Sequence, residues 1–329
     1  MSQKYIIDAD TGSDDAVAIL MALRDPKINV LGITIVSGNV PLKQGIINTI
    51  STAELCESDV KIYAGASKPL TRNYREVYTL EEFSDHVKSL SSDSVSAQCV
   101  HGVDGMGDIG VAPNQYEYEK TNAEDFLLKS FNNHPNEITL VTLGPLTNIA
   151  NIIKKDPTIV KKINHCYIMG GTSDGTGNVS AAAEYNIWVD PEAAEIVFNS
   201  GLLITMVGWD NSYKYAMLKD NEINSLKSLN SPYADFCVDI QKTLIDLTHE
   251  TYGFYGFDLP DPITMAVALD NHIILESQQL HVLIDTRDGI TRGQTIVDYF
   301  NAEKGNQNVR VVTKSDKDKF LKLLTELVK

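Results

Sequence analysis

Four aspartates lie within eight residues near the start of the chain, in the run Asp8-Ala9-Asp10-Thr11-Gly12-Ser13-Asp14-Asp15. The apolar residues 5–7 precede this run and the helix-like segment 16–23 follows it, so the pattern predicts a strand-to-helix junction crowded with carboxylates. Two like charges about 4 Å apart repel by roughly 1 kcal/mol in water and by roughly 4 kcal/mol at an effective dielectric of 20. The aspartates must therefore either point into solvent and cap the helix or gather around a hard divalent cation.

Helix capping accounts for only part of this cluster. Acidic residues in the first turn favour the positive end of the helix dipole, and Ser13 is a suitable N-cap. Asp10, however, lies at the carboxyl end of the predicted strand rather than in the helix. Ligands bind at that edge of open α/β sheets. The cluster as a whole is therefore predicted to bind a metal ion or to act in catalysis.

The length and the charge of the chain limit its organisation and its partners. A chain of 329 residues can form two average domains, but an α/β protein of this size is often one unit with a large core, so we predict a single domain over residues 1–329. The net charge of -16 argues against a nucleic-acid partner, because such proteins present concentrated Lys and Arg. No apolar run approaches the length that spans a bilayer, so no membrane partner is predicted.

The cysteines and the first residues indicate the compartment. Cys56, Cys99, Cys166 and Cys237 are widely spaced and have no CxxC pattern, which is typical of free thiols in a reducing compartment. The predicted first strand begins by about residue 5, which leaves no room for a charged leader followed by an apolar signal segment. We therefore expect a cytoplasmic protein.

Strand-like apolar runs alternate with helical patterns along most of the chain. Strands are predicted at 30–36, 60–64, 138–142, 166–169 and 202–207, and helices at 46–55, 146–153, 191–199 and 263–269. This alternation predicts an α/β fold with an open, mostly parallel sheet and helices on both faces. The polar segment 67–119 and the glycine-rich segment 170–185 interrupt the alternation, and long loops of this kind usually bind ligands.

Polar residues follow several of the predicted strands. Because the carboxyl ends of parallel strands meet at one edge of a sheet, we expect these residues to lie close together. They are Ser37-Gly38-Asn39, Leu143 to Asn148, Met169-Gly170-Gly171, Glu184-Tyr185-Asn186 and Asp261. Carboxylates and amides with few basic residues are a poor phosphate site but suit a polyol bound around a hard metal ion.

These junctions together resemble the nucleoside hydrolases, the inosine-uridine preferring N-ribohydrolase family. The resemblance runs nearly from end to end and also includes His101-Gly102-Val103-Asp104-Gly105, Asp190 to Ala194 and Thr291-Arg292-Gly293-Gln294-Thr295. It implies a Rossmann-like fold in a single domain. It also implies calcium-dependent hydrolysis of the N-glycosidic bond of ribonucleosides, which gives free nucleobase and ribose, and assembly into a homodimer or a homotetramer.

The resemblance further implies roles for individual residues. Ca²⁺ would be held by Asp10, Asp15, Asp261 and the backbone carbonyl of Leu143, and Asp10 would be the general base for a metal-activated water that attacks C1′ with inversion. Carboxylates and amide oxygens are suited to stabilise the oxocarbenium character of the sugar, with Asn186 among the catalytic groups. The implied substrate-binding residues are Asp14, Asn39 and Asn186 for the ribose hydroxyls, Asn178 and Glu184 for the 5′-hydroxyl, and Met169 for the wall of the sugar pocket.

The groups that would activate the departing base are less well defined by the sequence. The resemblance places His101 near the nucleobase. It also implies a histidine or tryptophan just before the last metal-binding aspartate, where this chain has Pro260, which can neither donate a proton nor stack strongly. His249, Tyr252 and Tyr255 lie upstream on a predicted helix and are candidates for binding the base. Trp188 and Trp209 are expected to pack in the core.

Two other functions are compatible with parts of the sequence. Asp8-Ala9-Asp10-Thr11 fits the DxDxT opening of magnesium phosphatases of the haloacid dehalogenase type, in which the first aspartate is the nucleophile. That chemistry also needs a phosphate-neutralising lysine and a late acidic pair, and neither has a convincing candidate. The loss of an activating residue at Pro260 would instead suit a protein that binds nucleosides on the same scaffold without hydrolysing them.

Overall fold

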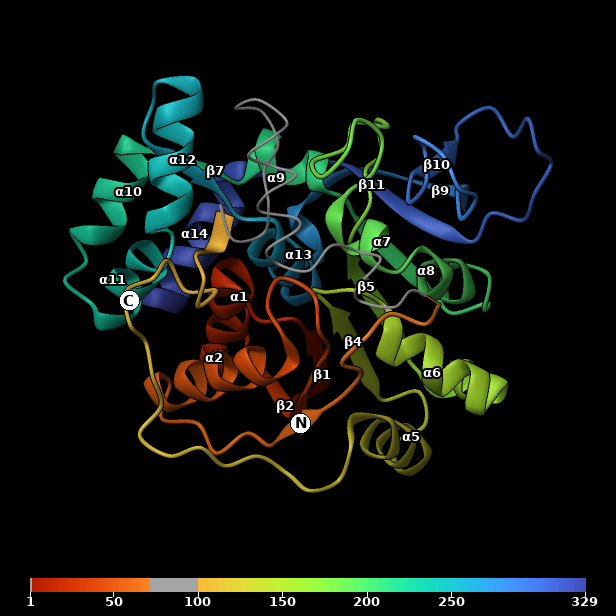
Figure 1. Ribbon diagram of the computed structural model, residues 1–329, viewed down its shortest axis with the longest axis horizontal. Coiled ribbons are helices and arrows are strands. Elements are labelled where there is room, and N and C mark those ends of the chain that lie inside the picture. Colours follow the sequence, from red (N-terminus) through yellow and green to blue (C-terminus); the bar gives the residue numbers. More distant parts are fainter. Residues whose placement is uncertain (1, 72–99) are drawn as a thin grey trace.

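The computed structural model describes residues 2–71 and 100–329, which form a sheet covered by helices on both faces (Figure 1). The strands of the main sheet are β1 (Gln3–Ala9), β2 (Ile28–Ile35), β3 (Ile62–Ala64), β4 (Ile138–Thr142), β5 (His165–Met169), β6 (Ile204–Val207), β9 (Ile274–Ile284), β10 (Thr295–Asp298) and β11 (Val309–Ser315). Their order is β10-β9-β11-β6-β5-β4-β1-β2-β3. The two pairings of β9, with β10 and with β11, are antiparallel, and all other pairings in this sheet are parallel. The predicted open, mostly parallel α/β sheet is therefore confirmed.

The helices of the structure include those predicted at 16–23, 46–55, 146–153, 191–199 and 263–269. They are α1 (Ser13–Arg24), α2 (Leu42–Leu55), α5 (Ala123–Asn133), α6 (Thr147–Lys155), α7 (Tyr185–Val189), α8 (Pro191–Phe198), α9 (Trp209–Tyr215), α10 (Asp220–Lys227), α11 (Pro232–Asp239), α12 (Lys242–Tyr252), α13 (Pro260–Leu269) and α14 (Lys317–Val328), with short 3₁₀ helices η1 (Pro157–Lys162) and η2 (Asn271–Ile273). A small antiparallel sheet joins β7 (Met217–Lys219) to β8 (Gly256–Asp258).

Two hydrophobic cores lie on opposite faces of the main sheet. Helices α1, α2, α13 and α14 pack on one face, and α5, α6 and α8 pack on the other (Figure 1). Every residue of β4 is buried, and so are residues 5–9 of β1. Such continuous burial is expected for parallel strands with helices on both faces. The site described below therefore stands on rigid, fully packed strands.

Some predicted boundaries differ from those of the structure. Helix α2 begins at Leu42 rather than at 46, and α13 begins at Pro260 rather than at 263. Proline is favourable in the first turn of a helix, because its missing N–H would have no partner there. Asp261 consequently lies in the first turn of α13. Strands β7 to β11 were not predicted.

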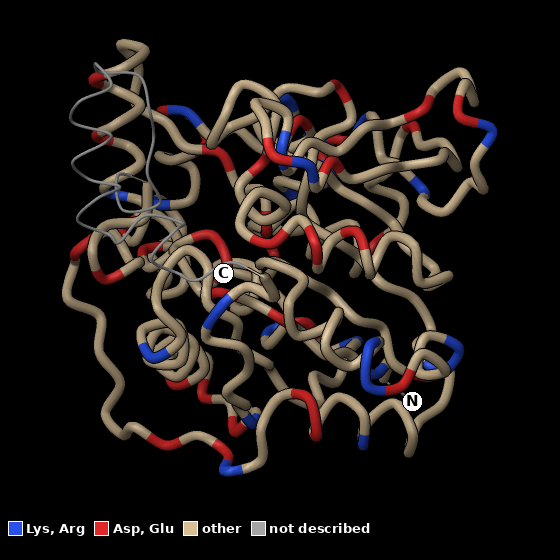
Figure 2. The backbone as a smooth tube through the Cα atoms, turned by 45° about the vertical axis from the view of Figure 1, so that its right-hand side comes forward, with Lys and Arg blue, Asp and Glu red and all other residues tan. Residues whose placement is uncertain are grey.

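The charged residues, the cysteines and the apolar character of the helices bear on the surroundings of the protein. Asp and Glu, like Lys and Arg, form short stretches spread over the molecule, and the acidic residues are the more numerous (Figure 2). Cys56, Cys166 and Cys237 are free thiols, and Cys99 lies outside the described residues, as does most of the predicted loop 67–119. Among the described residues, none of the helices has the length and apolar composition needed to cross a membrane.

Candidate active site

The site lies where the strand order of the sheet reverses. The chain builds β2 and β3 on one side of β1, and then β4, β5 and β6 on the other. The loops that follow β1 and β4 therefore diverge and leave a crevice between them at the carboxyl edge, as in other open α/β sheets. The predicted polar residues at the ends of β1, β2, β4 and β5 share this edge.

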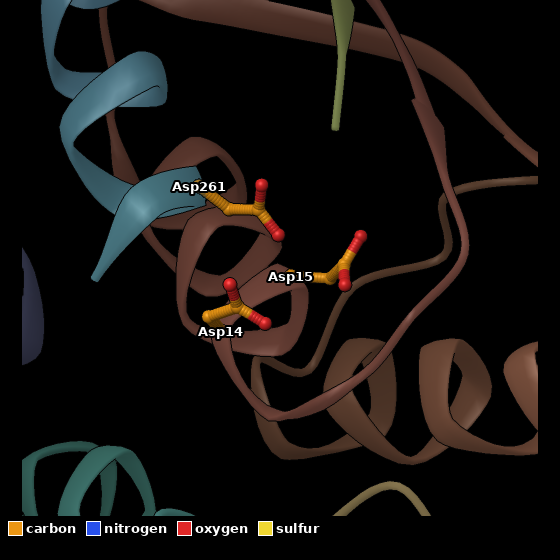
Figure 3. Close-up of side chains that lie close together, drawn as sticks. All are labelled: Asp14, Asp15 and Asp261. Atoms are coloured by element: carbon orange, nitrogen blue, oxygen red, sulfur yellow. The ribbon is translucent and has the colours of Figure 1, made fainter. Parts of the chain in front are cut away.

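Three carboxylates converge beside this edge (Figure 3). Asp14 and Asp15 lie in the first turn of α1, and Asp261 lies in the first turn of α13, which packs against α1. One carboxylate oxygen from each lies within 4.8 Å of the others, and all three residues are buried. This group, called the acidic cluster below, can hold a metal ion.

Asp10 borders the acidic cluster. Its backbone N–H donates to Asp15 Oδ1 at 3.3 Å, and its own Oδ2 accepts from the backbone N–H of Asn39 at 2.6 Å. Asn39 also donates through Nδ2 to Asp15 Oδ2 at 3.2 Å. Of the three predicted carboxylate ligands, Asp15 and Asp261 therefore belong to the acidic cluster, together with Asp14, and Asp10 lies next to it.

Two glycines confine the Asp10 carboxylate. A Cβ at Gly144 would lie 2.5 Å from Asp10 Oδ1, and a Cβ at Gly38 would overlap Asp10 Oδ2. Real Cβ atoms do not approach so closely, so only glycine fits at these positions while Asp10 keeps its place. The glycines of the Ser37-Gly38-Asn39 and Gly144-Pro145 segments thus explain why these motifs accompany the aspartates.

The site contains buried oxygens that lack partners. Asp10 Oδ1, Asp14 Oδ1 and Asp261 Oδ1 accept no hydrogen bond from the part of the chain that is described. Burial, followed by repulsion from neighbouring carboxylates, raises the pKa values of Asp10 and Asp261 well above the ordinary value and raises that of Asp15 to about 7. Buried charges of one sign need a counter-charge. Orphaned carboxylate oxygens at this spacing fit a hard divalent cation.

The ends of β4 and β5 are joined by Asn186. Its Nδ2 donates to the carbonyl oxygen of Leu143 at 2.7 Å and lies 3.2 Å from Met169 Sδ. A carbonyl oxygen has two lone pairs, so Leu143 can accept this bond and still contribute a ligand. The structure thus brings together Asn186, Leu143 and Met169, as the sequence predicted.

Glu184 and Asn178 bind backbone groups in this structure. Glu184 is the N-cap of α7 and accepts from the N–H groups of Gly171, Asn186 and Ile187 at 2.8, 2.9 and 3.3 Å. Burial nevertheless raises its pKa to about 7. Asn178 Oδ1 accepts from the N–H of Tyr185 at 2.9 Å. Both side chains therefore fasten the glycine-rich segment 170–185 to α7 and so shape the edge of the site.

His101 lies against the start of α1. Its Nδ1 is 2.9 Å from Ser13 Oγ and 3.6 Å from Asp14 Oδ1. The ring is buried, and desolvation lowers its pKa more than Asp14 raises it. The structure therefore places His101 beside the aspartates, and its contact with the nucleobase stays a prediction.

The other predicted base contacts, His249, Tyr252 and Tyr255, lie on the surface. The His249 and Tyr255 rings stack at 3.9 Å between centroids, with Tyr255 in the turn after α12 rather than on a helix. Tyr252, at the end of α12, is 72% exposed. No hydrogen bond joins these three to the acidic cluster within the described residues. Trp188 and Trp209 are both partly buried, and Trp209 Nε1 donates to Asp258 Oδ2 at 3.0 Å.

Asp258 and Gln241 had no role in the sequence interpretation, and the role that it gave Asp8 was that of the phosphatase nucleophile. Asp8 Oδ1 accepts from Thr34 Oγ1 and, at 2.8 Å, from Asn148 Nδ2, so the first aspartate of the opening run joins β1 to β2 and α6. Asp258 is half-buried, and desolvation raises its pKa, with a further contribution from the charge of Asp14. Gln241 Oε1 accepts from Ser13 Oγ at 2.8 Å. No local pattern marks Gln241, because it lies in the short connection between α11 and α12.

Comparison with known proteins identifies the family. The family model described as inosine-uridine preferring nucleoside hydrolase matches residues 5–322. The chain belongs to this family. The pyrimidine-specific ribonucleoside hydrolase RihB of Escherichia coli (strain SE11) is 32% identical over 327 residues, which cover 99% of this chain and 97% of RihB.

Solved nucleoside hydrolases share the whole fold. A plant nucleoside hydrolase, the PpNRh1 enzyme, has a TM-score of 0.87 and 29% identity and covers 100% of this chain and 99% of its own. The purine-preferring ribonucleoside hydrolase from Gardnerella vaginalis has a TM-score of 0.86 and 31% identity and covers 99% of both chains. The chain is therefore a nucleoside hydrolase that acts on ribonucleosides, and its enzyme class is hydrolase of N-glycosyl bonds.

The phosphatase alternative is incompatible with this family and with the geometry of Asp8. A nucleophilic aspartate must reach a phosphate, but Asp8 is fully buried and bonded to Thr34 and Asn148. Burial raises its pKa to about 7, which further weakens it as a nucleophile.

Proposed function

We propose that this nucleoside hydrolase cleaves the N-glycosidic bond of ribonucleosides with the help of Ca²⁺, releasing nucleobase and ribose. The observation that carries the proposal is the group of buried, partnerless carboxylate oxygens at the carboxyl edge of the sheet. We also propose that residues 1–329 form one domain. The cytoplasmic location, the lack of nucleic-acid and membrane partners and the homodimeric or homotetrameric state stay predictions.

The proposed calcium ligands are Asp10, Asp15, Asp261 and the carbonyl oxygen of Leu143, with Asp14 within reach. All are oxygen donors, which calcium prefers, and the carboxylates carry the charge that a dication neutralises. When bound, the ion would act as a Lewis acid that lowers the pKa of water and would orient the ribose 2′- and 3′-hydroxyls.

Asp10 is the proposed general base. Its Oδ1 is the oxygen without a hydrogen-bond partner, whereas Oδ2 is held by the Asn39 N–H. In the proposed step a water oxygen forms a bond to C1′, its proton passes to Asp10, and the C1′–N bond breaks with its electron pair leaving on the nucleobase. A base that is held in place by packing between Gly38 and Gly144 needs little reorganisation.

The remaining residues of the edge are proposed to bind the sugar. Asp14, Asn39 and Asn186 would bind the ribose hydroxyls, and Met169 would line the sugar pocket. The Asn186 side chain and the nearby carboxylates would stabilise positive charge on the ring as the bond breaks. Asn178 and Glu184, which hold the glycine-rich segment, would place it over the 5′-hydroxyl. His101 is the proposed contact to the base, and His249, Tyr252 and Tyr255 would reach it only if their surface segment approaches the substrate.

The names of the relatives do not transfer a base preference. RihB is named pyrimidine-specific, whereas the Gardnerella vaginalis enzyme is named purine-preferring, and the two are 32% and 31% identical to this chain. Nearly equal identity to enzymes of opposite preference supports ribonucleoside hydrolysis but neither class of base.

A substrate profile tests the proposed function. Purified protein is incubated with inosine, adenosine, uridine and cytidine in the presence of calcium, and free ribose is measured. We expect ribose from at least one nucleoside and a large loss of activity with its 2′-deoxy analogue, because the missing hydroxyl removes a binding contact. Binding without ribose release would favour the non-hydrolytic alternative that Pro260 suggests.

Calcium should stabilise the protein more at pH 7 than at pH 5. The pKa values of Asp10, Asp15 and Asp261 in the folded protein lie above the unfolded value of 3.8, so the metal-free protein loses stability from these groups as the pH rises from about 4 to about 7. Calcium removes this penalty, and protons compete with it at lower pH. The increase in Tm on adding calcium, measured at both pH values, checks this; an equal or larger increase at pH 5 would contradict it.

Replacing Gly144 with Ala should lower kcat on the order of 10²-fold, the loss typical of a catalytic group displaced by about 1 Å. The new Cβ would lie 2.5 Å from Asp10 Oδ1 and push the carboxylate aside. Gly45→Ala is the control, because its Cβ would contact the Ile35 methyl at 3.0 Å and stay 3.7 Å from the Asp10 backbone. Steady-state kinetics of the two variants test the confinement of Asp10; equal kcat values would contradict it.

A further inference from the structure

A chain of buried polar groups runs from His101 to the connection between α11 and α12. His101 Nδ1 lies 2.9 Å from Ser13 Oγ, and Ser13 Oγ donates to Gln241 Oε1 at 2.8 Å. Ser13 and Gln241 are fully buried, and His101 is 7% exposed. Neither Ser13 nor Gln241 has a part in the chemistry described above, yet both are fixed in position next to the proposed base contact.

With the Gln241 amide oriented as observed, its Oε1 facing Ser13 Oγ and its Nε2 without a partner among the described residues, the hydrogen count of this chain places a proton on Nδ1. A serine hydroxyl has one hydrogen, and that of Ser13 is used on Gln241 Oε1. The 2.9 Å contact with the imidazole is then a hydrogen bond only if Nδ1–H donates to Ser13 Oγ. The Ser13 backbone N–H also points toward Nδ1, but at 3.4 Å this is a longer and weaker contact than the one of 2.9 Å with Ser13 Oγ.

The charge beside the ring favours the same arrangement. Asp14 Oδ1 lies 3.6 Å from Nδ1, so a proton on this nitrogen faces a carboxylate. The ring edge carrying Nδ1 and Cγ also faces the start of α1, because a Cβ at Gly12 would lie 3.1 and 3.2 Å from these two atoms. Nε2 therefore lies at the opposite end of the ring, away from α1. The hydrogen bond at one ring nitrogen sets the state of the other.

We propose that Ser13 and Gln241 are positioning residues for His101: they hold its Nδ1–H and leave Nε2 as the ring nitrogen that meets the nucleobase. This inference rests on the proposed function, because it assumes that the enzyme cleaves a bond to a base. It assigns the orientation of the imidazole to residues that lie outside the acidic cluster. His101 would then be an ordered group near the base in a chain that has Pro260 where the family resemblance implies a histidine or tryptophan.

The variant Ser13→Ala tests the proposal through the leaving group. With inosine or uridine, whichever the wild-type protein hydrolyses faster, kcat/KM should fall about tenfold, as expected for one lost orienting hydrogen bond. With 4-nitrophenyl ribofuranoside, kcat/KM should be unchanged, because this substrate contains no nucleobase and its leaving group needs no proton. Gln241→Met should behave alike. Ser315→Ala is the control. It removes another buried hydroxyl, which donates to Asn211 Oδ1 at 2.9 Å, and its kcat/KM should match that of the wild type.

A second comparison asks whether Ser13 acts through His101. In a His101→Ala background, Ser13→Ala should have no further effect on the nucleoside, because the group it orients is gone. An equal loss in both backgrounds, or an equal loss on both substrates, would overturn the positioning role while leaving hydrolysis intact. Wild-type protein that releases ribose from no nucleoside would instead overturn the proposed function and this inference with it.

The protonated nitrogen can also be observed without a substitution at Ser13. The ¹⁵N spectra of the seven histidines, with His101 assigned by its loss in His101→Gln, report which ring nitrogen carries the proton. A neutral His101 with the proton on Nδ1 is expected. A proton on Nε2 alone would overturn the proposal even if the Ser13 variants failed to fold.

Discussion

Replacing Asp10 with Asn should lower kcat by about 10²–10⁴-fold, the range that a positioned general base contributes. Asparagine has the size of aspartate and so fits between Gly38 and Gly144. Its Oδ1 can accept the Asn39 N–H, which places the amide nitrogen where the partnerless Asp10 oxygen now lies. The variant therefore loses the atom that accepts the proton but keeps the fold, and ribose-like inhibitors should still bind.

Asp25→Asn is the matched control for this experiment. Asp25 is also buried, at the other end of α1, where its Oδ1 accepts from the Lys27 N–H at 2.9 Å. Its replacement should change stability slightly and kcat very little. Turnover by the Asp10 variant at the wild-type rate would rule out Asp10 as the base, and loss of inhibitor binding would mean that its role is to hold the ligand.

Replacing Asp261 with Ala should remove the bound ion. A ligand present at about 100 times its Kd stabilises a protein by about 2.7 kcal/mol, and this gain should disappear. Hydrolysis should fall with it. The metal-free variant should unfold no lower than the metal-free wild type, because it lacks a buried carboxylate whose own pKa is raised by burial and by the charges of Asp14, Asp15 and Asp10. Equilibrium dialysis and thermal unfolding with and without calcium measure both effects.

The control for the Asp261 variant lies at the other end of the same helix. Asp270 follows the last residue of α13 and caps η2 by accepting from the His272 N–H at 2.9 Å, away from the acidic cluster. Asp270→Ala should bind calcium as the wild type does. An Asp261 variant with full calcium content would contradict the proposed ligand set.

The parts of the fold that local patterns specify were predicted well. The buried strands β1, β4 and β5 contain the largely apolar runs that predicted them. The N-cap of α1, in contrast, is Gly12 rather than Ser13. The expectation that residues from several strand ends would meet at one edge followed from parallel topology, and the contacts of Asn39 with Asp10 and of Asn186 with Leu143 agree with it. The antiparallel β9 and β10 were missed, since the exposed positions of β9 obscure its apolar pattern.

The details of the site depend on tertiary packing and could not be predicted. The sequence around Asp8 and Asp10 does not distinguish their roles. In the structure Asp8 accepts hydrogen bonds from Thr34 and Asn148, whereas Asp10 lies between two glycines. Asp14 joins Asp15 and Asp261 because α1 and α13 pack together. Gln241 meets Ser13 across 228 residues of sequence. Such contacts are set by how elements dock rather than by the order of residues along them.

The most direct test of the account is a crystal structure of the protein grown in calcium. The account predicts one ion in the crevice at the carboxyl edge, with the Asp10, Asp15 and Asp261 carboxylates and the Leu143 carbonyl at about 2.3–2.6 Å, the usual range for calcium and oxygen. A structure in which no ion occupies this position, or in which it binds elsewhere and leaves these four residues without a ligand role, would contradict it.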